Sequence, residues 1–173
     1  WHYGRSLAYL HTGEMEKAEA EMAELSKIAA DFKAGLPGYN TEGLRIPRDT
    51  LIIGEQYVMG EVSAKKGDYD QAVYHLSNAV RLEDSDTYSE PPAWQFPTRH
   101  ALGAILMEAG RVREAETVYW ADLQHNPKNA YSYFGLYQSM LAQGKGELAA
   151  EYLALYEDAW KDSDVKLTSS RIK

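Results

Sequence analysis

A short pattern, a turn glycine with an alanine five residues later, occurs four times in this 173-residue chain. Its glycines are Gly13, Gly67, Gly110 and Gly144, and apolar residues recur at helical spacing on both sides of each. Successive glycines lie 54, 43 and 34 residues apart; we interpret the shortest spacing as one unbroken repeat and the others as that repeat with 20 and 9 inserted residues. The repeating unit is therefore a helix, a tight turn and a second helix. Because one such pair cannot bury its apolar face alone, neighbouring pairs must stack.

Two runs of residues resemble a known family. Residues 102–127 read LGAILMEAGRVREAETVYWADLQHNP, with the Leu-Gly pair, turn glycine, alanine, aromatic residue and terminal proline of the tetratricopeptide repeat (TPR). Residues 67–85 are similar to the second helix of the same repeat, whereas the first copy departs from it, with Arg5 and Ser6 where the Leu-Gly pair would fall. The resemblance implies an all-α fold, a right-handed α-solenoid of antiparallel helix pairs.

We predict a single solenoid over residues 1–173. The order of the insertions also resembles the C-terminal portion of longer, poorly characterised bacterial TPR proteins, which implies further repeats upstream of Trp1. The repeats are expected at about 1–32, 50–84, 97–129 and 130–161, the insertions at 33–49 and 85–96, and a C-terminal cap or tail at 162–173.

The N-terminal residues form an apolar set that is unusual for the end of a repeat array. Trp1, Tyr3, Leu7 and Leu10 lie within one predicted helix, and terminal repeats normally present a polar outer face to water. We expect upstream repeats or a second chain to cover this face.

Composition excludes several classes of partner. The formal net charge is -8 and the charges are scattered, so no basic surface is available to neutralise nucleic-acid phosphates. No apolar run is long enough to insert into a membrane, and the N-terminus lacks the pattern of a secretory signal. We expect a soluble protein, with the cytoplasm favoured over the periplasm. Without cysteine, the chain has neither disulfides nor thiolate metal sites.

No motif for catalysis, cofactor binding or metal binding is present. The sequence has no nucleophile elbow and no Gly-rich phosphate loop, and no two of its five histidines have the helical spacing of a zinc site. The acidic run at residues 83–86 lacks the glycine of a calcium loop. We therefore predict no catalytic residue, no cofactor, no metal and no enzymatic activity.

The insertion at 85–96 contains three aromatic residues, Tyr88, Trp94 and Phe96, in a Pro-rich stretch. Pro97 is suited to the first turn of the helix that follows. The aromatic side chains can fold back over apolar surface between repeats, which we favour, or they can contact a ligand.

The resemblance implies that the first helix of each repeat lines the concave side of the solenoid. Tyr57 and Phe134 are the expected apolar anchors for a bound peptide. Alternatively, some of these side chains pack against an insertion or the C-terminal segment. The predicted partner-binding residues are Tyr57, Glu61, Lys65, His100, Glu108, Phe134 and Gln138.

The function predicted from the sequence is a protein-interaction module that binds a peptide or protein segment on its concave helix face. One alternative is an architectural segment of a larger multi-repeat protein. The other is a small-molecule receptor or enzyme whose pocket is closed by the loop at 89–97.

Overall fold

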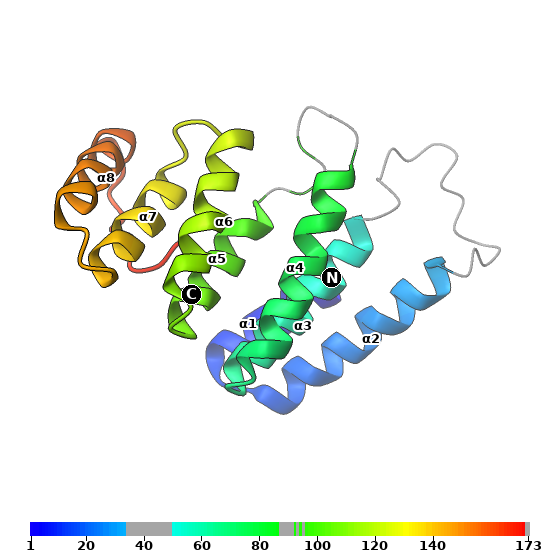
Figure 1. The fold of residues 1–173 in the computed structure, drawn as a ribbon. Coiled ribbons are helices and arrows are strands. Elements are labelled where there is room, and N and C mark those ends of the chain that lie inside the picture. Colours follow the sequence, from blue (N-terminus) through cyan, green and yellow to red (C-terminus); the bar gives the residue numbers. More distant parts are fainter. Residues whose placement is uncertain (34–49, 87–91, 93, 95, 172–173) are drawn as a thin grey trace. The chain divides into compact units, whose positions relative to one another are not determined.

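The computed structural model describes residues 1–33, 50–86, 92, 94 and 96–171. The chain divides into two compact units, Trp1–Gln95 and Phe96–Lys173, and the boundary lies at the end of the second predicted insertion. All regular secondary structure in the described ranges is helical (Figure 1). The helices are α1 (His2–Thr12), α2 (Met15–Lys33), α3 (Thr50–Lys65), α4 (Tyr69–Ser85), α5 (Thr98–Glu108), α6 (Val112–His125), α7 (Ala130–Ala142) and α8 (Gly146–Ala159).

Unit 1 contains two helix pairs, α1 with α2 and α3 with α4. Each pair turns at a glycine with positive φ, 83° at Gly13 and 82° at Gly67, a conformation that glycine adopts without steric cost. The side chain of Asp68 caps α4 by accepting a hydrogen bond from the main-chain N–H of Gln71 at 3.1 Å. The apolar core between the pairs includes Leu10, Ala18, Leu25, Val58 and Val62.

Unit 2 repeats this arrangement with α5 against α6 and α7 against α8, while α7 also packs on both α5 and α6. Its turns are at Gly110 and Gly144, each with a φ of 73°. Asn129 caps α7, because its side chain accepts a hydrogen bond from the main-chain N–H of Tyr131 at 2.9 Å. The buried core includes Ala101, Ile105, Leu106, Ala115, Leu136 and Met140.

Small residues let the two helices of a pair approach closely. Gly60 and Gly103 are 43 residues apart, as are the turn glycines of their repeats. A Cβ added to Gly60 would lie 2.6 Å from Cγ of Leu76, and one added to Gly103 would lie 2.4 Å from Cζ of Tyr119. Ser6 takes this place in the first copy, where it is buried and donates a hydrogen bond to a main-chain oxygen of α2 at 2.8 Å. The departure from the Leu-Gly pair therefore keeps a small residue at the helix contact.

The predicted all-α helical repeat is confirmed by these four helix pairs. The pairs follow the order predicted from the glycine period, and the first three close over a small residue, Ser6, Gly60 or Gly103. Continuity of the solenoid across both units stays a prediction.

Candidate interaction site

The predicted site residues of unit 1 lie on α3, and two of them are buried. Tyr57 is 5% exposed, and its ring centroid lies 5.9 Å from that of Tyr3 and 6.2 Å from that of Trp94. The Trp94 ring also lies above Gly54, where an added Cβ would be 3.4 Å from the indole. The lack of a side chain at Gly54 thus makes room for the tryptophan, and Trp94 covers the aromatic surface around Tyr57.

Glu61 and Lys65 follow Tyr57 at helical spacing but differ in environment. Glu61 is 3% exposed, whereas Lys65 is exposed at the end of α3. Burial raises the pKa of the Tyr3 hydroxyl well above its ordinary value, and the nearby Glu61 carboxylate raises this pKa further. Of the three α3 residues, Lys65 is the one that a partner can reach directly.

In unit 2, His100 on α5 and Phe134 on α7 are buried, at 1% and 8% exposure. The His100 ring stacks on Tyr131 with a centroid distance of 5.2 Å and receives the edge of Phe96 at 4.9 Å. The Phe134 ring packs against Tyr156 of α8 at 5.1 Å. Both predicted residues therefore belong to an aromatic layer that joins α5, α7 and α8.

The other two predicted residues of unit 2 are at least partly exposed. Gln138 lies one turn after Phe134 on α7 and is half-buried. Glu108, the last residue of α5, forms an ion pair with Arg171, whose Nη2 lies 2.9 and 3.0 Å from the two carboxylate oxygens. The loop residue Tyr88 lies outside the described residues.

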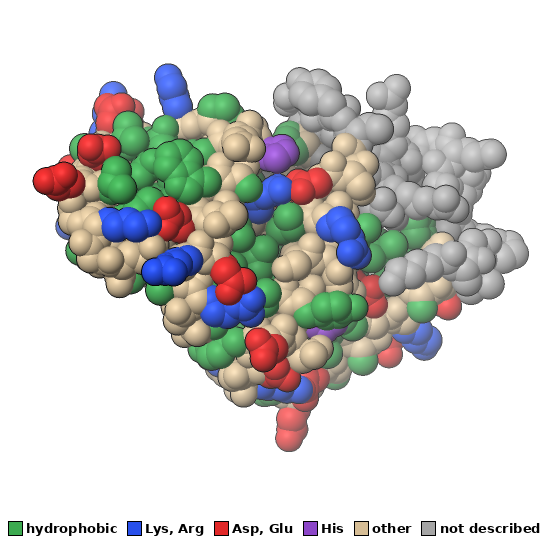
Figure 2. Space-filling model, viewed as in Figure 1, with side chains coloured by type: hydrophobic (Ala, Val, Ile, Leu, Met, Phe, Trp, Pro, Cys, Tyr) green, Lys and Arg blue, Asp and Glu red, His purple; other side chains and the backbone are tan. Residues whose placement is uncertain are grey.

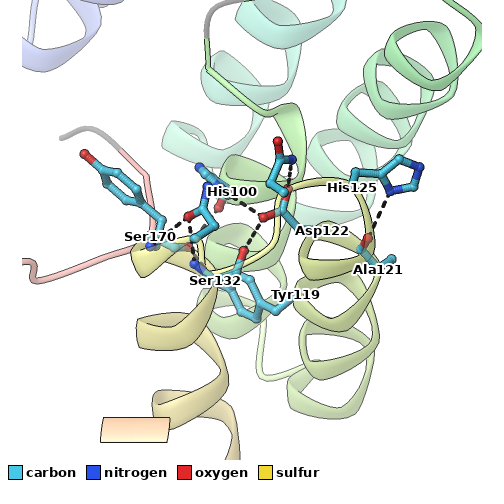
Figure 3. A network of polar contacts seen from close by, with 10 residues as sticks. His100, Tyr119, Ala121, Asp122, His125, Ser132 and Ser170 are labelled. Atoms are coloured by element: carbon cyan, nitrogen blue, oxygen red, sulfur yellow. Dashed lines mark hydrogen bonds and ion pairs between the residues drawn. The ribbon is translucent and has the colours of Figure 1, made fainter. Parts of the chain in front are cut away.

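A buried polar network lies beneath this aromatic layer (Figure 3). Asp122 of α6 is fully buried, and its carboxylate oxygens lie 3.1 Å from Nε2 of His100, 2.5 Å from Oγ of Ser132 and 2.9 Å from Nδ2 of Asn126. Burial alone would raise the pKa of Asp122, but these hydrogen bonds outweigh it and hold the pKa below its ordinary value. The ionised carboxylate thereby connects α5, α6 and the start of α7.

Although the network contains serine, histidine and aspartate, it lacks the geometry of a hydrolytic triad. In such a triad the histidine stands between the serine and the aspartate and removes the serine proton. Here Asp122 stands in the middle and Ser132 donates to it directly. Since Ser132 and Asp122 are fully buried and His100 is 1% exposed, the arrangement stabilises the packing of α5, α6 and α7.

The Tyr119 ring occupies the narrow space between α5 and α7. A Cβ added to Gly103 on α5 would lie 2.4 Å from its Cζ, and one added to Gly135 on α7 would lie 2.2 Å from the same atom. The ring can pass between the helices because both positions are glycine. Its hydroxyl lies 2.6 Å from Oγ of Ser170. Both side chains are labelled in Figure 3.

Ser170 belongs to the C-terminal segment, residues 162–171, which has no regular secondary structure and runs past α7 to α5 (Figure 1). Its Oγ donates to the main-chain oxygen of His100 at 2.9 Å and therefore accepts the proton of the Tyr119 hydroxyl. Burial raises the pKa of Tyr119 well above its ordinary value, so that this proton is retained. We call the surface formed by His100, Glu108 and the Tyr119 hydroxyl, together with Phe134 and Gln138, the α5–α7 face.

A different part of unit 2 exposes large apolar side chains, and Figure 2 shows green side chains gathered where α6, α7 and α8 lie. Leu148 and Leu155 of α8 are seven residues apart on one helix face and are 42% and 45% exposed. Trp120 of α6 is 45% exposed and meets the edge of Tyr152 at a centroid distance of 5.5 Å. This apolar surface does not include the predicted site residues.

The sequence did not reveal the buried polar groups of unit 2 or their contacts with the C-terminal segment. Asp122 lies three residues after Tyr119 and seven after Ala115, on the buried stripe of α6, so a carboxylate at that position signals a buried network. Helical periodicity gives no sign of the buried Ser170 or of the ion pair of Arg171, because both residues lie outside the helices.

The described part of the chain holds neither a cluster of metal ligands nor a membrane-spanning helix. Within those ranges, no three histidine, aspartate or glutamate side chains come together in a way that could hold a metal ion. No described helix is both long enough and apolar enough to cross a membrane.

Comparison with known proteins finds similarity to a curated protein and to solved structures. No protein-family model matches the sequence. TPR repeat-containing protein MJ1428 of Methanocaldococcus jannaschii is 27% identical over 142 residues, which cover 68% of this chain. The match covers 23% of the archaeal protein, so this chain spans less than a quarter of its relative's length.

The crystal structure of MamA protein matches over 96% of both chains with a TM-score of 0.53. The two sequences are 14% identical, so this likeness concerns the fold alone. The fold of this chain is therefore a helical repeat that resembles the tetratricopeptide repeat in both sequence and structure.

Proposed function

We propose that this chain is a protein-interaction module and that its α5–α7 face binds a polypeptide segment without regular secondary structure. One observation carries the proposal: the chain's own C-terminal segment lies on this face, with Ser170 fully buried against α5 and α6. A surface that holds one such segment through hydrogen bonds and an ion pair has the donors and acceptors to hold another.

The predicted residues divide into two roles under this proposal. His100 and Phe134 are buried and shape the face, whereas Glu108 and Gln138 are placed to contact a partner. On unit 1, Lys65 is the exposed contact, and Tyr57 becomes available only if Trp94 moves away.

An architectural role is the second candidate, and a separate observation favours it. Trp94 already covers Tyr57 in unit 1, and the C-terminal segment already covers part of the α5–α7 face in unit 2. If both surfaces are occupied by the chain itself, they do not bind a partner, and the helix pairs instead support neighbouring repeats in a larger assembly.

A selection from displayed random peptides separates the two candidates. Peptides that bind the whole chain are retested on Glu108→Arg and Gln138→Arg, with Glu151→Arg on the exposed surface of α8 as the matched control. We expect at least a tenfold loss of affinity with the first two variants and no loss with the control. If no peptide is selected, or if all three variants bind equally, the α5–α7 face does not bind partners.

A further inference from the structure

We propose that the α5–α7 face recognises a serine or threonine followed by an arginine in a partner polypeptide. Ser170 and Arg171 of this chain occupy the place of that pair. The inference rests on the proposed function, because it names the chemistry of the partner for the same face.

The hydroxyl position is selective for a small side chain that both donates and accepts. Ser170 is fully buried, and its Oγ bridges the Tyr119 hydroxyl at 2.6 Å and the main-chain oxygen of His100 at 2.9 Å. An alanine would remove both hydrogen bonds and leave the buried Tyr119 hydroxyl without this partner, which is costly. Threonine keeps the hydroxyl and adds one methyl group.

The hydroxyl of Tyr119 is particular to unit 2. The corresponding residue 43 positions earlier, Leu76, packs against Gly60 as Tyr119 packs against Gly103, but it carries no polar atom. A phenylalanine ring would occupy the same space between the helices, so packing does not require a hydroxyl at position 119. The hydroxyl is directed instead to the segment that lies on the α5–α7 face.

The next position holds a guanidinium group that pairs with a carboxylate. Nη2 of Arg171 lies 2.9 and 3.0 Å from the two carboxylate oxygens of Glu108. The Arg171 side chain is 11% exposed and that of Glu108 is 28% exposed, so water screens the pair only in part. Charge-assisted bonds of this kind are stronger than neutral ones and fix the direction of the bound segment.

Most residues before this pair are exposed. Residues 161–166 and Thr168 are exposed, and Val165 is 59% exposed. Two hydrogen bonds hold this part: the Trp160 indole donates to the main-chain oxygen of Val165, and the main-chain N–H of Leu167 lies 3.4 Å from the Tyr156 hydroxyl, a long hydrogen bond. The buried part of the attachment is thus confined to Ser169, Ser170 and the side chain of Arg171, and a partner with the same two-residue chemistry can compete for this place.

The test uses the whole chain and a labelled peptide of residues 162–171. In one variant, Ser170→Asp and Arg171→Glu together place negative charge beside Glu108 and release the segment. We expect the peptide to bind this variant at least ten times more tightly than the wild type, whose own segment competes. A peptide with glutamate in place of its arginine should not bind.

A charge exchange makes the test specific. Because Glu108→Arg would pair with a glutamate at position 171 of the same chain, the exchange is made in a chain released by Ser170→Ala with Arg171→Ala. In that chain, Glu108→Arg should reject the original peptide and accept the glutamate peptide, whereas Glu151→Arg should change neither affinity. Circular dichroism verifies helix content, and the milder whole-chain variant Arg171→Ala repeats the comparison if the double variant does not fold. Equal binding to the wild type and to a folded released variant, or binding unaffected by Glu108→Arg, overturns the inference.

This inference and the proposed function can fail separately. If displayed peptides bind the α5–α7 face but lack a hydroxyl residue before arginine, the interaction module stands and the proposed recognition is wrong. If the labelled peptide binds the released variant while the selection yields no binding peptide, the recognition of serine and arginine stands. It then acts only within the chain, by holding the C-terminal segment on the α5–α7 face.

Discussion

At the scale of single residues, the carboxylate of Asp122 is the feature that most departs from the apolar pattern of the repeat. It is fully buried, yet hydrogen bonds from His100, Ser132 and Asn126 keep its pKa below the ordinary value. Sequence alone predicts that position 122 faces the core, because it follows Tyr119 at helical spacing. It does not predict the three donors, since they come from different elements and meet only when α5, α6 and α7 pack.

Asp122→Asn should therefore change the pH dependence of stability. Because the folded pKa is lowered, the ionised carboxylate stabilises the wild type fully above about pH 4, and this contribution is lost as pH falls through the folded pKa. At pH 7 we expect the variant to lose about 1–3 kcal/mol of unfolding free energy, because the charge-assisted bonds are weakened.

Urea unfolding from about pH 7 down to about pH 2.5 measures this effect. The difference between the wild type and the variant should shrink toward the acidic end. Asp158→Asn, whose side chain is 80% exposed, is the control and should match the wild type throughout. A constant difference at every pH would contradict the assignment of the lowered pKa to Asp122.

At the scale of elements, the period of turn glycines was sufficient to predict the helix pairs, because left-handed turns and close helix contacts are local requirements of the chain. The course of the C-terminal segment could not be predicted in this way. Ser170 is fixed by Tyr119, 51 residues earlier, and Arg171 by Glu108, 63 residues earlier. For the same reason, the sequence placed His100 and Phe134 on the first helices without showing what would cover them.

The contact between α5 and α6 should not tolerate a side chain at position 103. Gly103→Ala would place a Cβ 2.4 Å from Cζ of Tyr119, and the ring is confined on its other side by Gly135. We expect a loss of about 1–3 kcal/mol in unfolding free energy, although alanine favours a helix over glycine by about 1 kcal/mol. Gly4→Ala, with no atom within 4 Å of the added Cβ, is the control and should be neutral or stabilising in urea unfolding.

At the scale of the whole molecule, the net charge of -8 bears on which partners are attracted. The C-terminal segment, residues 162–171, contains two acidic and two basic side chains, so its attachment gains nothing from this long-range field. A partner with basic flanks around the same serine and arginine would gain from it. The chain is therefore suited to exchange its own segment for a more basic one.

A peptide of residues 162–171 with lysine in place of Asp162 and Asp164 should thus bind the released variant more tightly than the unmodified peptide at about 0.05 M salt. The advantage should disappear at about 0.5 M salt, where charges beyond the contact are screened. Fluorescence anisotropy titrations measure both affinities. An advantage that persists at high salt would show that the added lysines make new direct contacts and do not respond to the net charge.

The Tyr119 ring lies between α5 and α7, and this position restricts which substitutions the sequence can accept during evolution. The glycines at positions 103 and 135 can change only together with Tyr119, because a larger residue at either glycine requires a smaller one at 119. Two repeats of this chain already show such fitted pairs at corresponding positions, Gly60 with Leu76 and Gly103 with Tyr119. In descendants of this sequence, we expect the last pair to be inherited as a unit, with Gly135 retained wherever the tyrosine is kept.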